Sequence, residues 1–173
     1  NRSKSELGQT LLPLLNDGDA EIQAQAAKVI GDEKVQGASS LLIPLLTSSS
    51  DRVKFYAAQA LGRLEAKEAV TPLLEMVRVN ADKDLYLRHT AVLALSRIGN
   101  QQALVAVSKD NSKSVRIAAV LALRRLKSDQ VAIFLKDADE YIVTEAARAI
   151  NDDHSIPAVL PALANVLKEK RFT

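Results

Sequence analysis

One pattern of apolar residues recurs five times along the chain and most constrains how it can fold. Each copy has a large aliphatic residue, an alanine four positions later and another large aliphatic residue eight positions after the first. This spacing places all three on one face of an α-helix. The copies align without gaps at residues 22–30, 53–61, 87–95, 115–123 and 142–150, and their first residues are 31, 34, 28 and 27 positions apart. Such a period is typical of repeat proteins whose units pack on their neighbours.

Local signals place a helix over each copy, which we call the second helix of its repeat. An Asp or Ser stands three residues before each copy, at Asp19, Ser50, Asp84, Ser112 and Asp139. These side chains can accept hydrogen bonds from the free N–H groups of a first helical turn. Gly31, Gly62 and Gly99 lie near the other end of three copies, and we expect them to stop those helices. The expected second helices span residues 19–31, 50–64, 84–99, 112–126 and 139–150.

A Leu-rich first helix precedes each second helix. Three of them share a Pro-Leu-Leu sequence, which begins at Pro13, Pro44 and Pro72. The expected first helices span residues 10–15, 39–47, 67–80, 101–109, 128–136 and 157–168. The last of these has no second helix after it. The sequence therefore predicts an all-α fold, a right-handed α-solenoid of about five and a half helix–turn–helix repeats, in a single domain over residues 1–173.

Composition agrees with this architecture and excludes several classes of function. The chain is 47% hydrophobic but only 3% aromatic and has no Trp, so its core must be aliphatic. The absence of Cys excludes disulfides, Cys-type zinc sites and thiol nucleophiles. A net charge of +2 gives no electrostatic footprint for nucleic acid or for an anionic membrane. No apolar run reaches the roughly 20 residues of a membrane span. Because the chain begins with Asn1 and not Met, we expect it to be part of a longer protein.

The repeats resemble HEAT-like repeats, especially the short bacterial kind also seen in phycobilisome-lyase proteins. The resemblance rests on an Asp…Val-Arg…Ala-Ala…Ala-Leu-Gly pattern that is best kept at residues 84–99, and it implies a fold more than a chemistry. Residues 84–95 and 143–152 also look like segments of large bacterial membrane-bound dehydrogenase-like proteins, which join a β-propeller, a HEAT-like region and a cytochrome c-type domain. That resemblance implies that the chain is the helical middle region of such a protein and lies in the periplasm. If the resemblance does not hold, we expect the chain to be cytoplasmic. The Cys-x-x-Cys-His haem motif is absent, so no haem or quinone residue carries over.

Two columns of the repeat alignment carry charged residues. Ten positions after the start of each copy stand Asp32, Arg63, Arg97, Arg125 and Asp152, so three consecutive copies carry an arginine there. Arginine suits bidentate contact with carboxylate or phosphate, so an arginine edge could dock an acidic partner. Alternatively, these are last-turn cations that the helix dipole favours. One position after each start stand Gln23, Lys54, Arg88, Arg116 and Val143. We expect the basic members to pair with the Asp that begins a neighbouring helix, which would form a ladder of charge-assisted bonds.

Three further residues complete the candidate sites. Tyr56 should point away from the buried face of its helix and could either contact a partner or pack on a neighbouring repeat. His89 lacks sequence neighbours that would make it a base or metal ligand, so we expect a structural or surface role. His154 follows two aspartates in what we interpret as a solvated loop, since its spacing matches no metal motif. The candidate partner-binding residues are Tyr56, Arg63, His89, Arg97 and Arg125.

The sequence favours a non-catalytic interaction or scaffold module. A groove formed by the second helices would bind a protein partner or space flanking domains of a parent chain. No phosphate loop, Gly-x-Ser-x-Gly or His-Glu-x-x-His motif is present, and we expect no enzyme activity, cofactor or metal. One alternative is nucleic-acid binding by a HEAT-like groove, which the low net charge and the lack of Trp disfavour. Two others are an accessory domain of a sugar-dehydrogenase-like or haem protein and a chromophore lyase or isomerase. The last is a designed repeat array, which the irregular spacing of the copies disfavours.

Overall fold

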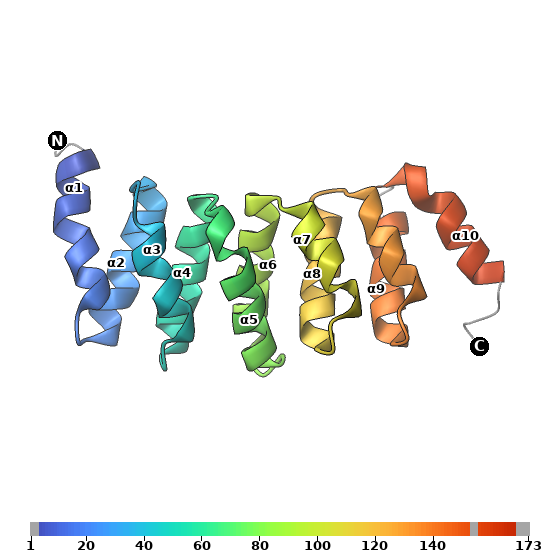
Figure 1. Cartoon of the computed structure of the whole chain (residues 1–173), viewed down its shortest axis with the longest axis horizontal. Helices are drawn as coiled ribbons and strands as arrows, with labels where there is room; N and C mark the ends of the chain where they lie inside the picture. Colours follow the sequence, from blue (N-terminus) through green and yellow to red (C-terminus); the bar gives the residue numbers. More distant parts are fainter. Residues whose placement is uncertain (1–3, 153–155, 169–173) are drawn as a thin grey trace. The chain divides into compact units, whose positions relative to one another are not determined.

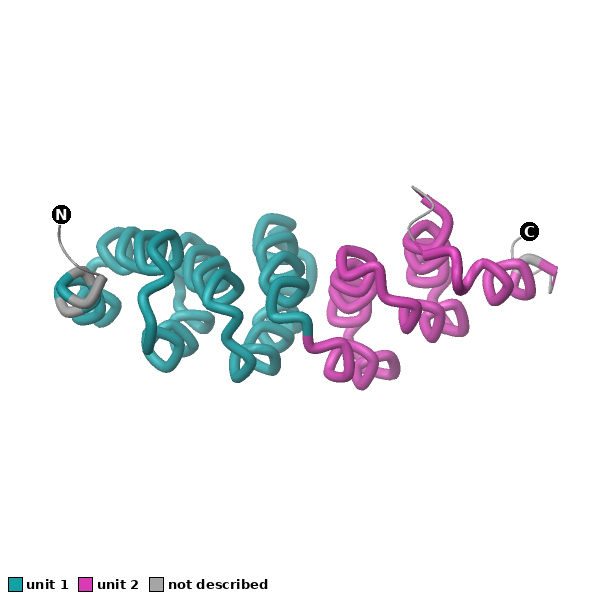
Figure 2. The backbone as a smooth tube through the Cα atoms, turned by 90° about the horizontal axis from the view of Figure 1, so that it is seen from above, with its two compact units in different colours: residues 1–99 teal, residues 100–173 magenta. Residues whose placement is uncertain are grey.

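The computed structural model describes residues 4–152 and 156–168, and throughout these residues the regular structure is helical, without strands. The chain forms two compact units, unit 1 at Asn1–Gly99 and unit 2 at Asn100–Thr173 (Figure 2). The all-α class predicted from sequence is confirmed, and in each unit helix pairs follow one another as in an α-solenoid. His154, the second histidine of the chain, lies outside the described residues.

Unit 1 contains three helix pairs, and 3₁₀ segments (η) complete the first helix of each pair (Figure 1). The elements are α1 (Lys4–Leu11) with η1 (Leu12–Asn16) and α2 (Ala20–Glu33); α3 (Ser39–Leu42) with η2 (Ile43–Thr47) and α4 (Asp51–Arg63); and η3 (Lys67–Ala69) with α5 (Val70–Asn80) and α6 (Leu85–Ile98). The first pair begins at Lys4 and not at the expected residue 10.

Unit 2 contains two helix pairs and a further first helix, whose second helix has no counterpart among the described residues. The elements are α7 (Gln101–Ala106) with η4 (Val107–Lys109) and α8 (Lys113–Arg125); η5 (Asp129–Lys136) and α9 (Glu140–Asn151); and η7 (Pro157–Val159) with α10 (Leu160–Lys168). Pro13, Pro44 and Pro157 stand in the first turn of 3₁₀ segments, where their missing N–H groups cost no helical hydrogen bond.

The second helices pack side by side and bury the predicted aliphatic-and-alanine face. In unit 1, α4 lies between α2 and α6; in unit 2, α8 packs on α9 (Figure 1). Ala57 and Ala119, at the middle of this face, are fully buried. The first residue of the pattern is buried in four copies, but Ile22 is 40% exposed, contrary to expectation. The reason is that, within the described residues, no second helix precedes α2 to cover this side chain.

Each second helix begins at the predicted polar residue. The side chains of Asp19, Ser50, Asp84, Ser112 and Asp139 each accept a hydrogen bond from a backbone N–H of the first turn, as predicted. A second polar residue, not predicted, accepts a bond from the N–H of each of these capping residues; this set is Asp17, Ser48, Asn80, Asp110 and Asp137. Every turn between a first and a second helix is therefore fixed by its own side chains.

The role predicted for two of the glycines is wrong. Gly99 ends α6 in the left-handed conformation, with φ 72°, as expected. Gly31 and Gly62 instead lie inside α2 and α4, where they allow the next second helix to approach closely. A Cβ atom on Gly62 would lie 2.5 Å from the Cα atom of Ala94, and one on Gly31 would lie 2.7 Å from that of Ala60.

Non-glycine residues end three of the second helices in the left-handed region. Lys34, Glu65 and Lys127 have φ of 52°, 54° and 52°. The residue after each of them donates its N–H to a carbonyl five positions back, which completes the helix terminus. A side chain in this conformation costs roughly 1–2 kcal/mol, because its Cβ crowds the backbone.

We expect Lys127→Gly to raise the free energy of unfolding by about 1 kcal/mol, since glycine relieves this crowding at an exposed position. The midpoint of urea unfolding measures the change. Lys136, exposed at the end of η5 and without a positive φ, supplies the control: Lys136→Gly gains nothing. Equal shifts for both variants would show that the left-handed conformation is not the cause.

The predicted ladder was wrong in its partners, since among the described residues none of its basic members binds the Asp that begins a neighbouring helix. Arg116 reaches the next repeat, where its Nε donates to Asp137 Oδ2 at 2.8 Å. Lys54 and Arg88 instead bind carboxylates of their own repeat, those of Asp51 and Asp82.

Contacts between repeats also involve first-turn residues outside the predicted column. Arg52 pairs with Glu21 at 2.9 Å. In unit 2, Lys113 Nζ lies 2.8 Å from Asp139 Oδ2, and this hydrogen bond holds the pKa of Asp139 below its usual range. Adjacent repeats are thus linked at their turns by exposed ion pairs, which contribute little individually.

Candidate partner-binding site

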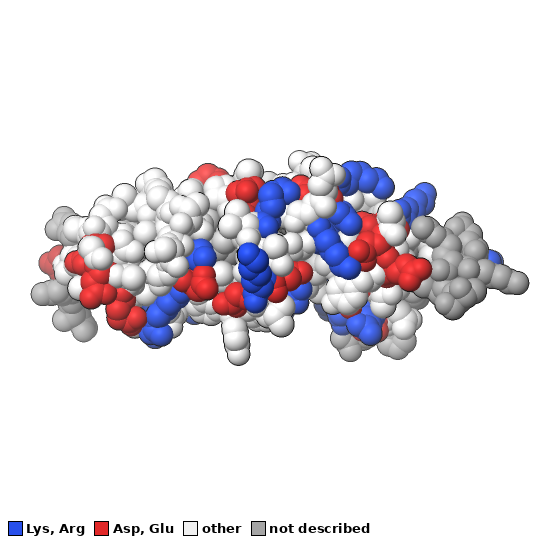
Figure 3. All heavy atoms as spheres, turned by 90° about the horizontal axis from the view of Figure 1, so that it is seen from below, with Lys and Arg blue, Asp and Glu red and all other residues white. Residues whose placement is uncertain are grey.

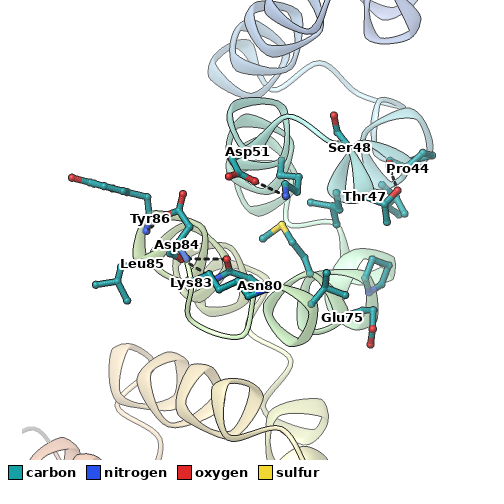
Figure 4. A pocket seen from close by; sticks show the side chains of 16 residues that line it. Pro44, Thr47, Ser48, Asp51, Glu75, Asn80, Lys83, Asp84, Leu85 and Tyr86 are labelled. Atoms are coloured by element: carbon teal, nitrogen blue, oxygen red, sulfur yellow. Dashed lines mark hydrogen bonds and ion pairs between the residues drawn. The ribbon is translucent and has the colours of Figure 1, made fainter.

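An open, partly apolar cleft lies between the second and third repeats of unit 1 (Figure 4). It has a volume of about 1050 Å³ and is walled by η2, the start of α4, α5, and the turn and first residues of α6. Half of the lining residues are apolar: Ile43, Pro44, Leu46, Pro72, Met76, Val79, Leu85 and Tyr86. A concave surface of this size and composition can hold several side chains of a partner.

The rim of the cleft exposes large apolar side chains to solvent. Val79 is 71% exposed, Leu85 58% and Tyr86 77%. These three are the most exposed large apolar residues of the described part of the chain, and all three line the same cleft. In Figure 4, Tyr86 extends away from the cleft wall. Clustered exposure of this kind marks interaction surfaces on otherwise soluble domains.

The turn that carries this rim is held rigidly. The side chain of Asn80 donates to the carbonyl of Asp84 at 2.8 Å and accepts from the N–H of Asp84 at 3.1 Å (Figure 4). Ala81 and Asp82 both adopt the left-handed conformation, with φ of 46° and 60°, and Arg88 binds the Asp82 carboxylate at 3.2 Å. Strained backbone of this kind concentrates at functional positions.

Most charges at the cleft already have partners within unit 1. Asp51 lies 2.5 Å from Lys54, and Glu75 lies 2.9 Å from Arg78. The Asp84 carboxylate caps α6 by accepting the N–H groups of Tyr86 and Leu87. Lys83 differs, because among the described residues no carboxylate lies within ion-pair distance of its exposed ammonium group.

Among the described residues, one member of the arginine edge predicted from sequence forms an ion pair. In unit 1, Arg63 forms an ion pair with Asp32, one repeat earlier. Arg97 is exposed and lines a smaller depression of about 450 Å³ together with Arg63, Lys34, Asp32 and Glu65. This depression lies at the carboxyl ends of the second helices, where the helix dipoles favour cations and disfavour a bound anion.

The remaining candidates lie apart from the cleft lining. Tyr56 is half-buried. The centroid of its ring lies 5.3 Å from that of Phe55 and 5.5 Å from the Cζ atom of the Arg52 guanidinium. His89 is exposed on α6, and Arg125 is exposed at the end of α8 in unit 2. None of the five residues proposed from sequence lines the apolar cleft.

Sequence reasoning missed Leu85 and Tyr86, although the repeat alignment contained a signal for them. The residues two positions before the start of each copy are Ala20, Asp51, Leu85, Lys113 and Glu140. This column lies in the exposed first turn, and Leu85 is its one large apolar member. A large apolar residue in a solvent-facing column is a better indicator of contact than an aromatic residue beside a buried face.

Charge on the turn side of the molecule is mixed. Figure 3, seen from the side of the turns between first and second helices, shows acidic and basic side chains interspersed in each unit.

Across residues 4–152 and 156–168, no group of three or more His, Cys, Asp or Glu residues is arranged to hold a metal ion. In the same residues, no helix has the length and apolar character that a membrane crossing requires.

A model of the HEAT-repeat family matches residues 8–85, 41–123 and 79–151, which together span most of the chain. The chain therefore belongs to the HEAT-repeat family. Repeats of this family generally serve in protein interaction or scaffolding and typically have no enzymatic role. A comparison with curated proteins found no match.

Two similar solved structures are crystal structures of engineered proteins from the Northeast Structural Genomics Consortium. The first is 23% identical, with a TM-score of 0.53 over 95% of this chain and 88% of the other. The second is also 23% identical, with a TM-score of 0.47 over 92% of this chain and 51% of the other. At 23% identity, the similarity to the first of these structures supports the fold of this chain and says nothing of its function. The expected dehydrogenase and haem context receives no support from these relatives.

Proposed function

We propose that this chain is a non-catalytic protein-interaction module whose partner docks in the apolar cleft of unit 1. The observation that carries the proposal is the coincidence of the cleft with the exposed rim residues Val79, Leu85 and Tyr86. Removing such side chains from water is favourable by about 25 cal/mol per Å² of apolar surface, so a partner that covers them gains affinity.

The position of the cleft differs from the groove proposed from sequence. That groove was formed by the second helices and bordered by arginines. The cleft instead lies where first and second helices meet, at the turn side of the second and third repeats. We favour the cleft because Arg63 is already paired with Asp32, whereas the rim of the cleft presents apolar surface that nothing within unit 1 covers.

Peptides selected from a random 12-residue phage-display library on the whole chain test this function. We expect the selected peptides to lose about tenfold in affinity on Tyr86→Ala, since exposed aromatic residues at a cleft rim often dominate binding energy. Fluorescence anisotropy with labelled peptides measures the dissociation constants.

The matched control is Tyr141→Ala. Tyr141 occupies the same position in its repeat as Tyr86 and is 48% exposed in the first turn of α9, away from the cleft. Peptides that bind Tyr86→Ala and Tyr141→Ala equally well would reject the cleft as the docking site. Circular dichroism of both variants verifies that the helices remain folded.

A further inference from the structure

We infer that the apolar cleft selects a partner segment with a lysine or arginine beside bulky apolar side chains, and that this cation binds the Asp84 carboxylate and the Tyr86 ring. The inference rests on the proposed function, because it specifies the chemistry of the partner at the same cleft. It is carried by a comparison of equivalent positions in two pairs of second helices, α4 with α6 in unit 1 and α8 with α9 in unit 2.

In unit 2 the chain itself supplies a cation at the start of a second helix. Lys113, in the first turn of α8, reaches the start of α9, where its Nζ lies 2.8 Å from Asp139 Oδ2 and 5.2 Å from the centroid of the Tyr141 ring. Asp139 caps α9 with its other oxygen, Oδ1, which accepts the N–H of Tyr141. A carboxylate and an aromatic face each stabilise an ammonium group. This position can therefore hold a cation even though the positive end of the helix dipole is close.

In unit 1 the equivalent positions keep the carboxylate and the aromatic ring but lack the cation. Asp84 is the capping residue three positions before its copy of the pattern, and Tyr86 stands one position before the copy. Their counterparts in unit 2 are the two residues that contact the ammonium group. The lysine that provides this group stands two positions before the preceding copy, and in unit 1 that position holds Asp51.

The Asp84 carboxylate and the Tyr86 ring are both available to a partner. Asp84 accepts the N–H groups of Tyr86 and Leu87 with Oδ1, and these bonds leave its negative charge in place. Among the described residues, no ammonium or guanidinium group lies within ion-pair distance of Asp84, and none lies over the Tyr86 ring. Tyr86 is accordingly 77% exposed, whereas Tyr141, which Lys113 covers, is 48% exposed. In Figure 4 the Tyr86 ring extends clear of the cleft wall.

The selection of a cation is local and does not depend on the net charge of the cleft. Asp51 is bound by Lys54 at 2.5 Å, and Glu75 is bound by Arg78 at 2.9 Å. Among the charged residues that line the cleft, Asp84 and Lys83 then remain without an ion pair in the described part of the chain. Opposite charges are thus balanced, and the contact that unit 2 shows at the equivalent carboxylate and ring decides for a cation.

A polypeptide can supply the cation and cover apolar surface at the same time. Leu85 stands between Asp84 and Tyr86 in the first turn of α6 and is 58% exposed, and Val79 in the same cleft is 71% exposed. A small amine bound at Asp84 would leave these apolar side chains in water, whereas a segment with apolar residues beside its lysine or arginine would bury them.

Peptides selected from the 12-residue library on the whole chain test the inference. We expect them to be enriched in Lys or Arg beside apolar residues and to lose about fivefold in affinity on Asp84→Asn, the size typical of an exposed ion pair. Asparagine caps a helix about as well as aspartate, so α6 should keep its start. A copy of the peptide with norleucine in place of its basic residue should bind Asp84→Asn and the natural chain equally well. Fluorescence anisotropy measures the dissociation constants.

The matched control is Asp139→Asn, which makes the same change at the capping residue that Lys113 already holds in unit 2 and should leave the affinity unchanged. Asp51→Lys tests the site from the other direction, because it places a lysine at the position of Lys113. We expect this lysine to occupy the site and to weaken the basic peptides about tenfold. Glu75→Lys makes the same change of charge elsewhere in the cleft lining and should weaken them about twofold at most.

Some outcomes would overturn the inference while the proposed function stands. These are Tyr86-dependent peptides without a basic residue, equal responses to Asp84→Asn and Asp139→Asn, and equal losses on Asp51→Lys and Glu75→Lys. Peptides that do not depend on Tyr86 overturn both proposals. Tyr86-dependent self-association in sedimentation velocity, or displacement of the peptides by phosphatidylcholine vesicles, would identify a second copy or a lipid headgroup as the occupant and would also overturn the inference.

Discussion

Gly62→Ala should destabilise unit 1 by about 3 kcal/mol, the upper end of the range for overpacked cores. In an ordinary helix the same substitution gains about 1 kcal/mol, because alanine favours the helical backbone. Here the new Cβ would lie 2.5 Å from the Cα atom of Ala94 and 2.8 Å from its Cβ atom. No rotamer change can relieve a contact with backbone, so α4 and α6 must separate and lose their packing. Urea unfolding followed by far-ultraviolet circular dichroism measures the loss.

Two further variants establish the cause. Gly18→Ala is the control, since a Cβ at this exposed turn position meets nothing within 4 Å, and we expect a change below about 0.5 kcal/mol. Ala94→Gly combined with Gly62→Ala should recover only part of the loss, because the Cα atom of residue 94 remains in place. A stable Gly62→Ala protein would show that the second helices do not need this close approach.

Arg116→Ala should destabilise unit 2 by about 3 kcal/mol, because it strands a buried carboxylate. The Asp137 side chain is 5% exposed and that of Arg116 14%. The Arg116 guanidinium binds both oxygens of Asp137 and also donates to the carbonyl of Asp110, so it joins two successive turns. Without it, the N–H of Asp139 is the donor that remains to that carboxylate among the described residues, and one hydrogen bond does not compensate a buried charge. Thermal unfolding, with far-ultraviolet circular dichroism as the signal, measures the effect.

Arg124→Ala provides the comparison within the same helix. Arg124 pairs with Asp152 at 3.3 Å, but the two side chains are 30% and 44% exposed, so we expect a loss of at most about 1 kcal/mol. Similar losses for the two arginine variants would mean that burial of the Arg116 pair contributes nothing beyond an ordinary surface contact.

The second helices could be located from sequence because their signals are local. A capping Asp or Ser and an aliphatic residue every four positions act within one helix, and the observed helices begin directly after the expected caps. The roles of Gly31 and Gly62 could not be deduced in the same way. Both stand near helix ends, as stop signals do, and only the distance to the next helix shows that they serve packing.

The candidate site was harder to predict than the fold, because a cleft depends on residues from several elements. Arg63 and Arg97 stood out as neighbours of like charge, and the weight of Asp32, at the same position of the preceding repeat, became clear only in the structure, where it pairs with Arg63. Conversely, nothing in the sequence sets Val79 apart until the structure exposes it at the same cleft as Leu85, whose exposed column in the repeat alignment was the available signal. Tyr56 was predicted as a contact residue because it should point away from the buried face of its helix, and in the structure Phe55 and Arg52 lie against its ring.

The self-contained turns have a consequence for how such a chain can acquire a binding site. Each turn is closed by its own pair of polar side chains, and the same arrangement of caps serves turns of different length. The turn between α5 and α6 has four residues where the others have three. The longest of these connections is thus also the one that leads into Leu85 and Tyr86, so we expect variation in turn length to be one route by which such repeats gain contact residues.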